Sequence, residues 1–217
     1  MDYAAARKAM IDSQIRPNDV TDHEILAAFG AIEREPFLPM ERRPHAYVEM
    51  EIAYADHRSM VPARDFSKLL QAMDIRSGDL ILDVANGNGY STAILASLGE
   101  MVVGIENSEP LAVAAEEQLG SMGISNAAVI TGDLTSGAVS QGPFNAILIC
   151  AVIEKTPETL IDQLTMGGRL GAFLFENGVT KGVTYLKSPS GVSKVDHFTA
   201  CVTNSLPEFK KSKEFIF

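Results

Sequence analysis

The chain has 217 residues, of which 46% are hydrophobic and 21% are charged, and its formal net charge is −10. This length and composition suit one sizeable α/β domain with a modest appendage, whose core needs neither disulfides nor metal. The acidic balance, with no basic run, argues against nucleic acid as the main partner and against anionic membrane surfaces.

The cysteines and the N-terminus indicate a reducing compartment. Cys150 and Cys201 are the only cysteines, and each lies within an apolar run. This placement predicts buried free thiols. The N-terminus lacks the apolar region of a signal peptide, and no stretch approaches the roughly 20 apolar residues of a membrane span. We therefore expect a cytoplasmic protein. We expect no metal site, because His23, His45 and His197 lack ligand spacing.

Residues 1–62 are polar and punctuated by proline. Their apolar spacing predicts helices over Ala4–Gln14 and Thr21–Ile32, the second with Thr21 as its N-cap. Prolines then break the pattern, and Ala46–Tyr54 is expected to be extended or irregular. This segment has too little apolar surface for a core of its own. We therefore expect it to pack as a helical or irregular flank, or lid, on the remainder of the chain.

From residue 63 onward, strand and helix patterns alternate. The predicted strands are Leu80–Val84, Met101–Ile105, Ala127–Ile130, Phe144–Cys150 and Gly168–Phe175. The predicted helices are Phe66–Met73, Ser91–Leu98, Pro110–Met122 and Pro157–Leu164. Alternation of this kind is typical of βαβ units around a parallel sheet with helices on both faces. The tail, Gly182–Lys187 and Ser193–Val202, predicts a β-hairpin. The expected fold is a doubly wound, Rossmann-like α/β domain over residues 63–217, mostly parallel with a C-terminal antiparallel hairpin.

A glycine-rich loop, Asp83-Val-Ala-Asn-Gly-Asn-Gly89, follows the first predicted strand. In open α/β sheets, ligands bind at the carboxyl ends of the strands near the topological switch point. The dinucleotide pattern G-x-G-x-x-G fails here, because the third glycine place after Gly87 holds Thr92. The spacing suits the (D/E)-x-G-x-G-x-G loop of S-adenosylmethionine enzymes, with Ala85 at the first glycine. A tight turn without a ligand is the alternative.

Acidic residues follow the second and third predicted strands. Glu106 lies 23 residues after Asp83, where a carboxylate accepts hydrogen bonds from both ribose hydroxyls. Asp133 is placed to accept from an adenine amino group, or else to cap its own turn. Together with the loop, these positions predict an adenosyl ligand. The predicted cofactor-binding residues are Asp83, Ala85, Asn86, Gly87, Gly89, Tyr90, Glu106, Asn107, Gly132, Asp133 and Leu134.

Over nearly its full length the chain resembles the protein-L-isoaspartate O-methyltransferase family. Residues 15–22 and 32–39 look like its helical lead-in and its "PRExFVP" segment, and residues 163–170 look like its "QLKPGGRL" segment. Residues 82–96, with Tyr90 after the last glycine, look like its cofactor motif. The resemblance implies S-adenosylmethionine as methyl donor and S-adenosylhomocysteine as product. It also implies a protein or peptide acceptor, whose isoaspartyl carboxylate is methylated to begin repair.

The resemblance also locates a segment for substrate. The family carries "GQTIS" there, and its serine hydroxyl helps to position the substrate carboxylate. Here Asp56–Pro62 aligns on its proline, so Met60 takes the serine place and Ser59 precedes it. A methionine thioether cannot donate a hydrogen bond. We predict a substrate pocket of His57, Arg58, Ser59 and Met60, with Arg58 as a two-pronged carboxylate clamp. No catalytic residue is assigned, because a carboxylate is already ionised at neutral pH.

Two alternatives accompany this interpretation. Nucleic-acid amino-methyltransferases carry a (D/N)-P-P-(Y/F) run after the fourth strand, and residues 150–157 read CAVIEKTP instead. The other alternative is a homologue that binds S-adenosylmethionine or S-adenosylhomocysteine but has a different acceptor or no transferase activity. The sequence leaves that alternative open, together with the oligomeric state.

Overall fold

The computed structural model describes residues 1–211. The helices are α1 (Tyr3–Met10), α2 (His23–Ala31), α3 (Ala63–Met73), α4 (Tyr90–Ala96), α5 (Glu109–Ser121) and α6 (Glu158–Asp162). The strands are β1 (Ile52–Ala55), β2 (Arg58–Met60), β3 (Leu80–Val84), β4 (Met101–Glu106), β5 (Ala127–Thr131), β6 (Phe144–Ile153), β7 (Leu164–Glu176), β8 (Val179–Ser188) and β9 (Gly191–Thr199). None of the helices in this part of the chain has the length and apolar character to cross a membrane.

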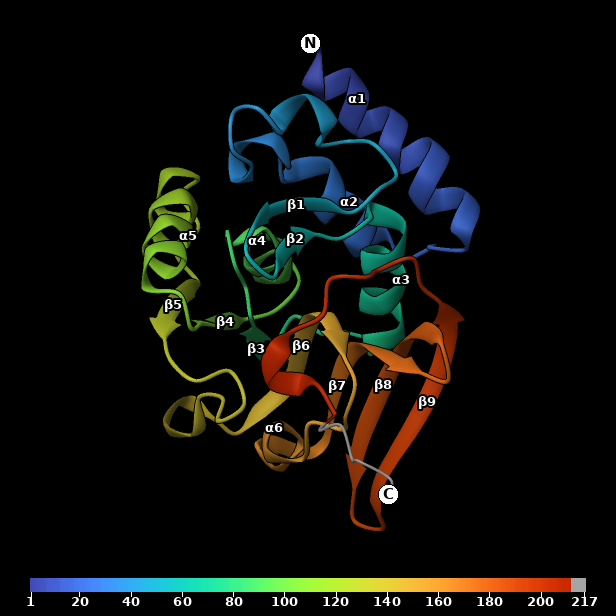
Figure 1. Ribbon diagram of the computed structural model, residues 1–217, viewed down its shortest axis with the longest axis vertical. Coiled ribbons are helices and arrows are strands. Elements are labelled where there is room, and N and C mark those ends of the chain that lie inside the picture. Colours follow the sequence, from blue (N-terminus) through green and yellow to red (C-terminus); the bar gives the residue numbers. More distant parts are fainter. Residues whose placement is uncertain (212–217) are drawn as a thin grey trace, which may run out of the picture.

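The large sheet has seven strands in the order β5-β4-β3-β6-β7-β8-β9 (Figure 1). Strands β3 to β7 run parallel, and β8 and β9 add an antiparallel hairpin. This confirms the fold predicted from the sequence. The chain leaves β3 toward β4 and β5 and later returns to the other side of β3 as β6. The switch point, where ligands bind in such sheets, therefore lies at the carboxyl ends of β3 and β6.

Residue composition explains which strands are central. Nearly every side chain of β6 is buried, because helices or loops cover both faces of the sheet there. In β9 nearly every residue is exposed, as expected at the sheet edge. Helix α3 packs against β7 at Gly171, where a β-carbon would overlap the Met73 side chain. The core is therefore centred on β3, β6 and β7, which hold the switch point rigidly.

The N-terminal segment shares its core with the helices that follow. Met10, Phe29 and Phe37 belong to the same buried cluster as Phe66 of α3. A small two-stranded sheet, β1 paired antiparallel with β2, lies between the N-terminal helices and the large sheet (Figure 1). This β1–β2 hairpin (residues 51–60) thus reaches the carboxyl edge of the large sheet.

Several local predictions were wrong. The predicted helix Pro157–Leu164 is shorter, ending at Asp162, and β7 begins at Leu164 and not at Gly168. Helix α2 is capped by Asp22, whose carboxylate accepts from the next turn, while the Thr21 amide donates instead to the Gln71 side chain. Strand β6 extends three residues beyond Cys150, because the C-terminal segment pairs with its end at Val152. The Cys201 thiol is exposed, since its apolar neighbours lie in an irregular segment and not in a strand.

Candidate functional site

The loop after β3 turns tightly through three residues with positive φ. These are Ala85 at 59°, Gly87 at 55° and Gly89 at 87°. Gly89 also allows α5 to approach, because a β-carbon there would lie 3.1 Å from that of Ala115. The loop therefore presents its backbone amides at the switch point, and Ala85 holds a conformation that favours glycine.

Asp83 fixes this loop and does not face an open site. Its fully buried carboxylate accepts hydrogen bonds from the Ser91 and Thr92 hydroxyls, both at 2.7 Å. Burial raises the pKa of Asp83 to about 7, with a smaller rise from Glu106, against the lowering effect of the two hydroxyls. The end of β3 is thereby tied to the first turn of α4.

All the hydrogen-bond acceptor sites of the Glu106 carboxylate, at the end of β4, are occupied by donors from the protein itself. Its Oε1 accepts from Arg58 Nη2 at 2.7 Å and from the Ser108 amide at 3.0 Å. Its Oε2 accepts from Arg58 Nε at 2.8 Å and from the Gly87 amide at 3.0 Å. A carboxylate offers about four lone-pair sites, so none remains for another donor. The residue predicted to hold a ribose holds a guanidinium in this structure.

Arg58 reaches Glu106 from the β1–β2 hairpin. Its side chain is only 7% exposed, and Nη2 also donates to Asn107 Oδ1 at 2.9 Å. Burial, the largest single influence, opposes the charged guanidinium, but the hydrogen bonds to Glu106 together with the charges of Glu106, Tyr54 and Glu208 outweigh it and raise the pKa of Arg58. The two-pronged clamp predicted for Arg58 is present, and the carboxylate that it grips belongs to the chain.

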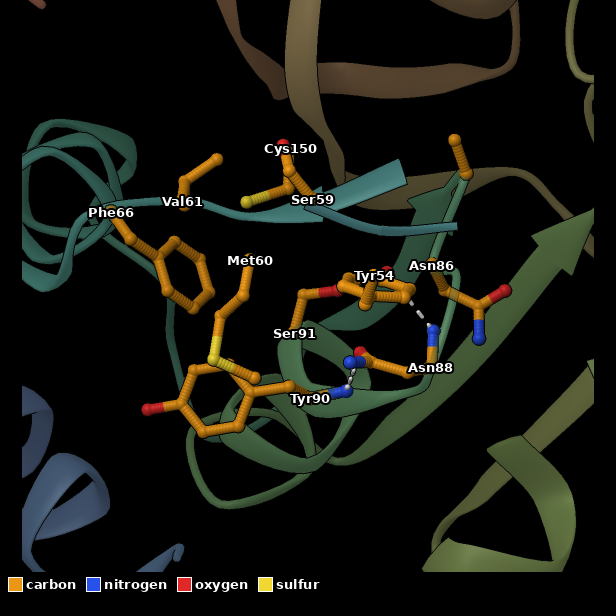
Figure 2. Close-up of a pocket in the computed structure, with 11 residues that line it drawn as sticks. Tyr54, Ser59, Met60, Val61, Phe66, Asn86, Asn88, Tyr90, Ser91 and Cys150 are labelled. Carbon is orange, nitrogen blue, oxygen red and sulfur yellow. Dashed lines mark hydrogen bonds between the residues drawn. The ribbon is translucent and has the colours of Figure 1, made fainter. Parts of the chain in front are cut away.

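Tyr54 enters the glycine loop from the same hairpin. Figure 2 shows its hydroxyl beside Asn88, whose backbone amide donates to it at 3.2 Å. The hydroxyl lies so close to Gly87 that a β-carbon there would overlap it. Close backbone approach, which a glycine loop usually offers to a ligand, is therefore used by Tyr54.

The other predicted substrate residues have different surroundings. Met60 is buried beside the rings of Phe66 and Tyr90 (Figure 2). The Ser59 hydroxyl donates to Glu51 at 2.6 Å. His57 lies at the hairpin turn, with its side chain 47% exposed. The structure thus brings Ser59 and Met60 to the glycine loop and leaves His57 at the surface.

A cavity of about 20 Å³ remains between the loop and the hairpin. This volume holds about one water molecule, whereas ligand sites span about 300–1,000 Å³. Both side-chain amide atoms of Asn86 are buried there without a hydrogen-bond partner. The cavity is lined by Tyr54, Ser59, Met60, Val61, Phe66, Ala85, Asn86, Asn88, Tyr90, Ser91 and Cys150.

The residues predicted to bind the adenine of the cofactor lie directly after β5. Leu134 is fully buried in the core. The exposed Asp133 carboxylate accepts from the Thr135 hydroxyl at 2.6 Å and the Ser136 amide at 2.7 Å, and these bonds lower its pKa. Asp133 therefore caps its own turn. A cleft of about 480 Å³ opens beside it, with Lys155 among its other lining residues.

A C-terminal strap, residues 203–209, crosses the same edge and was missed by the sequence analysis. Glu208 Oε1 accepts from the Asn107 side chain at 2.7 Å, next to Glu106. The Val152 amide donates to the backbone of Asn204 at 2.9 Å, which fastens the strap to β6. Figure 1 shows this red segment passing over the end of β6. No local pattern predicts such contacts, because the partners lie about 50 to 100 positions apart in the chain.

Comparisons with known proteins give one consistent result. A family model described as protein-L-isoaspartate(D-aspartate) O-methyltransferase matches residues 5–199. The protein-L-isoaspartate O-methyltransferase of Koribacter versatilis is 34% identical over 168 residues, which cover 77% of this chain and 76% of that protein. The enzyme of Petrotoga mobilis is 27% identical, over 93% of this chain and 95% of that protein.

Solved structures share the fold. One protein-L-isoaspartate O-methyltransferase superposes with a TM-score of 0.80 at 20% identity, covering 94% of this chain and 67% of that chain. A Plasmodium falciparum protein described as a protein-L-isoaspartate O-methyltransferase, in complex with S-adenosyl-L-homocysteine, gives a TM-score of 0.76 at 18% identity. That match covers 96% of this chain and 99% of that one.

Proposed function

Because the chain belongs to the protein-L-isoaspartate(D-aspartate) O-methyltransferase family, whose members depend on S-adenosylmethionine, we propose that it methylates isoaspartyl carboxylates of damaged proteins. The observation that carries the proposal is the set of groups at the switch point. The glycine loop and the Glu106 carboxylate meet there, joined by the Gly87 amide at 3.0 Å. An adenosyl ligand needs this combination in this topology.

The cofactor does not fit the site in the conformation described. Glu106 has no free acceptor, Tyr54 fills the space at Gly87, and the cavity between the loop and the hairpin is about 20 Å³. A separate cleft of about 300 Å³, lined by Arg58, Asn107 and Ser108 among others, lies beside Glu106. The β1–β2 hairpin has to leave before S-adenosylmethionine, the source of the methyl group, enters. The loop conformation and the two backbone hydrogen bonds to Glu106 involve no hairpin residue, which supports the proposal that they serve the cofactor once the hairpin is displaced.

The proposed reaction needs no general acid or base from the protein. An isoaspartyl carboxylate is ionised at neutral pH and needs no general base. The protein contributes alignment and exclusion of water. The buried rings of Phe66 and Tyr90, which do not belong to the hairpin, support the second of these contributions, because they border the glycine loop on one side with apolar surface.

The test is methyl transfer to an isoaspartyl peptide, with the aspartyl peptide of identical sequence as control. Methyl-labelled S-adenosylmethionine is the donor, and the product ester is measured as base-released methanol. We expect ester on the isoaspartyl peptide alone, and loss of the signal in Glu106→Ala. Equal labelling of both peptides, or labelling that persists in Glu106→Ala, would contradict the proposal.

One observation favours a second candidate function, a cofactor-binding homologue with another acceptor or no transferase activity. Met60 occupies the place that the family resemblance gives to a serine, and the neighbouring Ser59 hydroxyl is bound to Glu51 at 2.6 Å. No hydroxyl in this segment is free for a substrate carboxylate. Calorimetric binding of S-adenosylhomocysteine, combined with absence of ester on the isoaspartyl peptide, would select this candidate.

A further inference from the structure

Arg58 makes the same kind of contact with Glu106 that a ribose would make. It donates two hydrogen bonds, one to each carboxylate oxygen, at 2.7 and 2.8 Å. The remaining bond on each oxygen comes from a backbone amide, Ser108 or Gly87. Removal of Arg58 would therefore free one acceptor site on each oxygen, which matches the two hydroxyls of a ribose.

Tyr54 excludes a ligand from the adjoining position. Its hydroxyl accepts from the Asn88 amide and rests against Gly87, so the loop backbone is covered. Both side chains come from one hairpin of two short strands, Ile52–Ala55 and Arg58–Met60. They therefore leave the loop together when the hairpin moves.

The hairpin is not part of the large sheet. Its strands pair only with each other in the described sheets, and two-stranded hairpins are marginally stable on their own. Beyond Arg58 and Tyr54, the hairpin is attached through the buried side chains of Ile52 and Met60. The strap also holds it, because Glu51 accepts from Thr203 and Asn204, and the Asn204 side chain donates to the His57 carbonyl. Burying an ion pair also costs the free energy of removing both charges from water. The Arg58–Glu106 contact therefore stabilises the closed state, in which the hairpin covers the glycine loop, less than its geometry suggests.

We propose that the β1–β2 hairpin is an internal competitor for the cofactor site, with Arg58 in place of the ribose and Tyr54 against the glycine loop. The inference rests on the proposed use of S-adenosylmethionine. Cofactor binds only to molecules whose hairpin is displaced. The apparent dissociation constant then equals the intrinsic constant divided by the open fraction. Weakening the hairpin therefore strengthens cofactor binding.

The experiment is calorimetric titration of the full chain with S-adenosylhomocysteine. The variants are Arg58→Ala, Tyr54→Ala and the double variant Arg58→Ala/Glu106→Ala. Arg76→Ala is the control, because that side chain is 75% exposed and, within residues 1–211, forms an ion pair with Asp74 alone. Thermal unfolding checks that each variant is folded. Tyr54→Ala keeps the test valid if Arg58→Ala fails to fold, because it leaves no buried charge unpaired.

We expect Arg58→Ala and Tyr54→Ala to bind at least about tenfold more tightly than the wild type, as an open fraction below about one in ten requires. The double variant should lose this gain, and Arg76→Ala should match the wild type. Equal, measurable affinities in wild type, Arg58→Ala and Tyr54→Ala would overturn the competitor role and leave cofactor use intact. Weaker binding by Arg58→Ala and Tyr54→Ala would also overturn it, since Arg58 and Tyr54 would then be ligand contacts. Absence of binding in every variant would overturn the proposed function itself, and the competitor role with it.

Discussion

At the scale of single residues, Asp83 gives the protein a specific dependence on pH. Its pKa is about 7 in the folded state and about 3.9 in an unfolded chain. Between these values the folded state holds a proton that the unfolded state has lost. Its contribution to stability is therefore complete below about pH 4, declines as the pH rises toward 7, and is constant above that.

Asp83→Asn tests this dependence, because asparagine is nearly the same size and does not titrate. We expect the free energy of unfolding of the wild type, relative to Asp83→Asn, to fall as the pH rises from about 4.5 to 7.5. The slope is at most about 1.4 kcal/mol per pH unit. Urea unfolding at several pH values measures the difference. Parallel pH profiles for the two proteins would show that Asp83 is not the titrating group.

Ala85 carries backbone strain that glycine would relieve. Its φ of 59° is uncommon for a residue with a β-carbon. We expect Ala85→Gly to stabilise the fold by about 0.5–1 kcal/mol, after allowing for the greater freedom of glycine in the unfolded chain. Asn177→Gly is the matched control, since Asn177 has a φ of 54° but asparagine tolerates this region. Chemical denaturation should rank the gain from Ala85→Gly above that from Asn177→Gly, and the reverse order would count against the strain.

At the scale of secondary-structure elements, the sequence predicted the strands and the loop that form the site. It did not predict that Arg58 of the hairpin binds Glu106 there. The bounds of β3, Leu80–Val84, follow from its apolar run and the turns around it, and the structure has the same bounds. Glu106 ends β4 as the register with the glycine loop suggested. By contrast, the bond from Arg58 to Glu106 joins residues 48 positions apart. Local periodicity carries no information on such a pair, and a short hairpin after several prolines has no strong pattern of its own.

The hairpin and the strap are held together chiefly by one carboxylate. Glu51 accepts from the Ser59 hydroxyl, the Thr203 amide and hydroxyl, and the Asn204 amide, at 2.6–3.1 Å. A glutamine at position 51 would keep one oxygen that accepts hydrogen bonds. Its NH₂ group would replace the other oxygen and cannot accept from these donors. Loss of such bonds should loosen both segments while leaving the large sheet unchanged.

We therefore expect Glu51→Gln to speed amide hydrogen exchange in residues 52–60 and 203–206, with unchanged exchange in β3 and β6. Glu49→Gln is the control, because Glu49 is 45% exposed and contacts only Arg64 among the described ion pairs. Hydrogen exchange read by mass spectrometry resolves these segments. Equal exchange of the hairpin in Glu51→Gln and Glu49→Gln would contradict the role given to Glu51.

At the scale of the whole molecule, the N-terminal segment and the sheet form one structural unit around the switch point. Arg34, fully buried, donates to the backbone of Ala46 at 2.7 Å and of Val61 at 3.0 Å, and so braces both sides of the hairpin. Its guanidinium also lies 4.9 Å from the centre of the Tyr90 ring, beside the glycine loop. The N-terminal segment therefore acts on the site directly, through the hairpin that it carries. The solved structures of the family share the fold of this chain.

Hydrogen exchange of the wild-type protein, with and without saturating S-adenosylhomocysteine, tests this account most directly. If the ligand replaces Tyr54 and Arg58, residues 84–92 should exchange more slowly in its presence, and residues 52–60 should exchange faster because the hairpin has left the site. Slower exchange in both segments would mean that the hairpin closes over the ligand as a lid, and unchanged exchange in both would mean that the site binds no ligand. Either result would contradict the account.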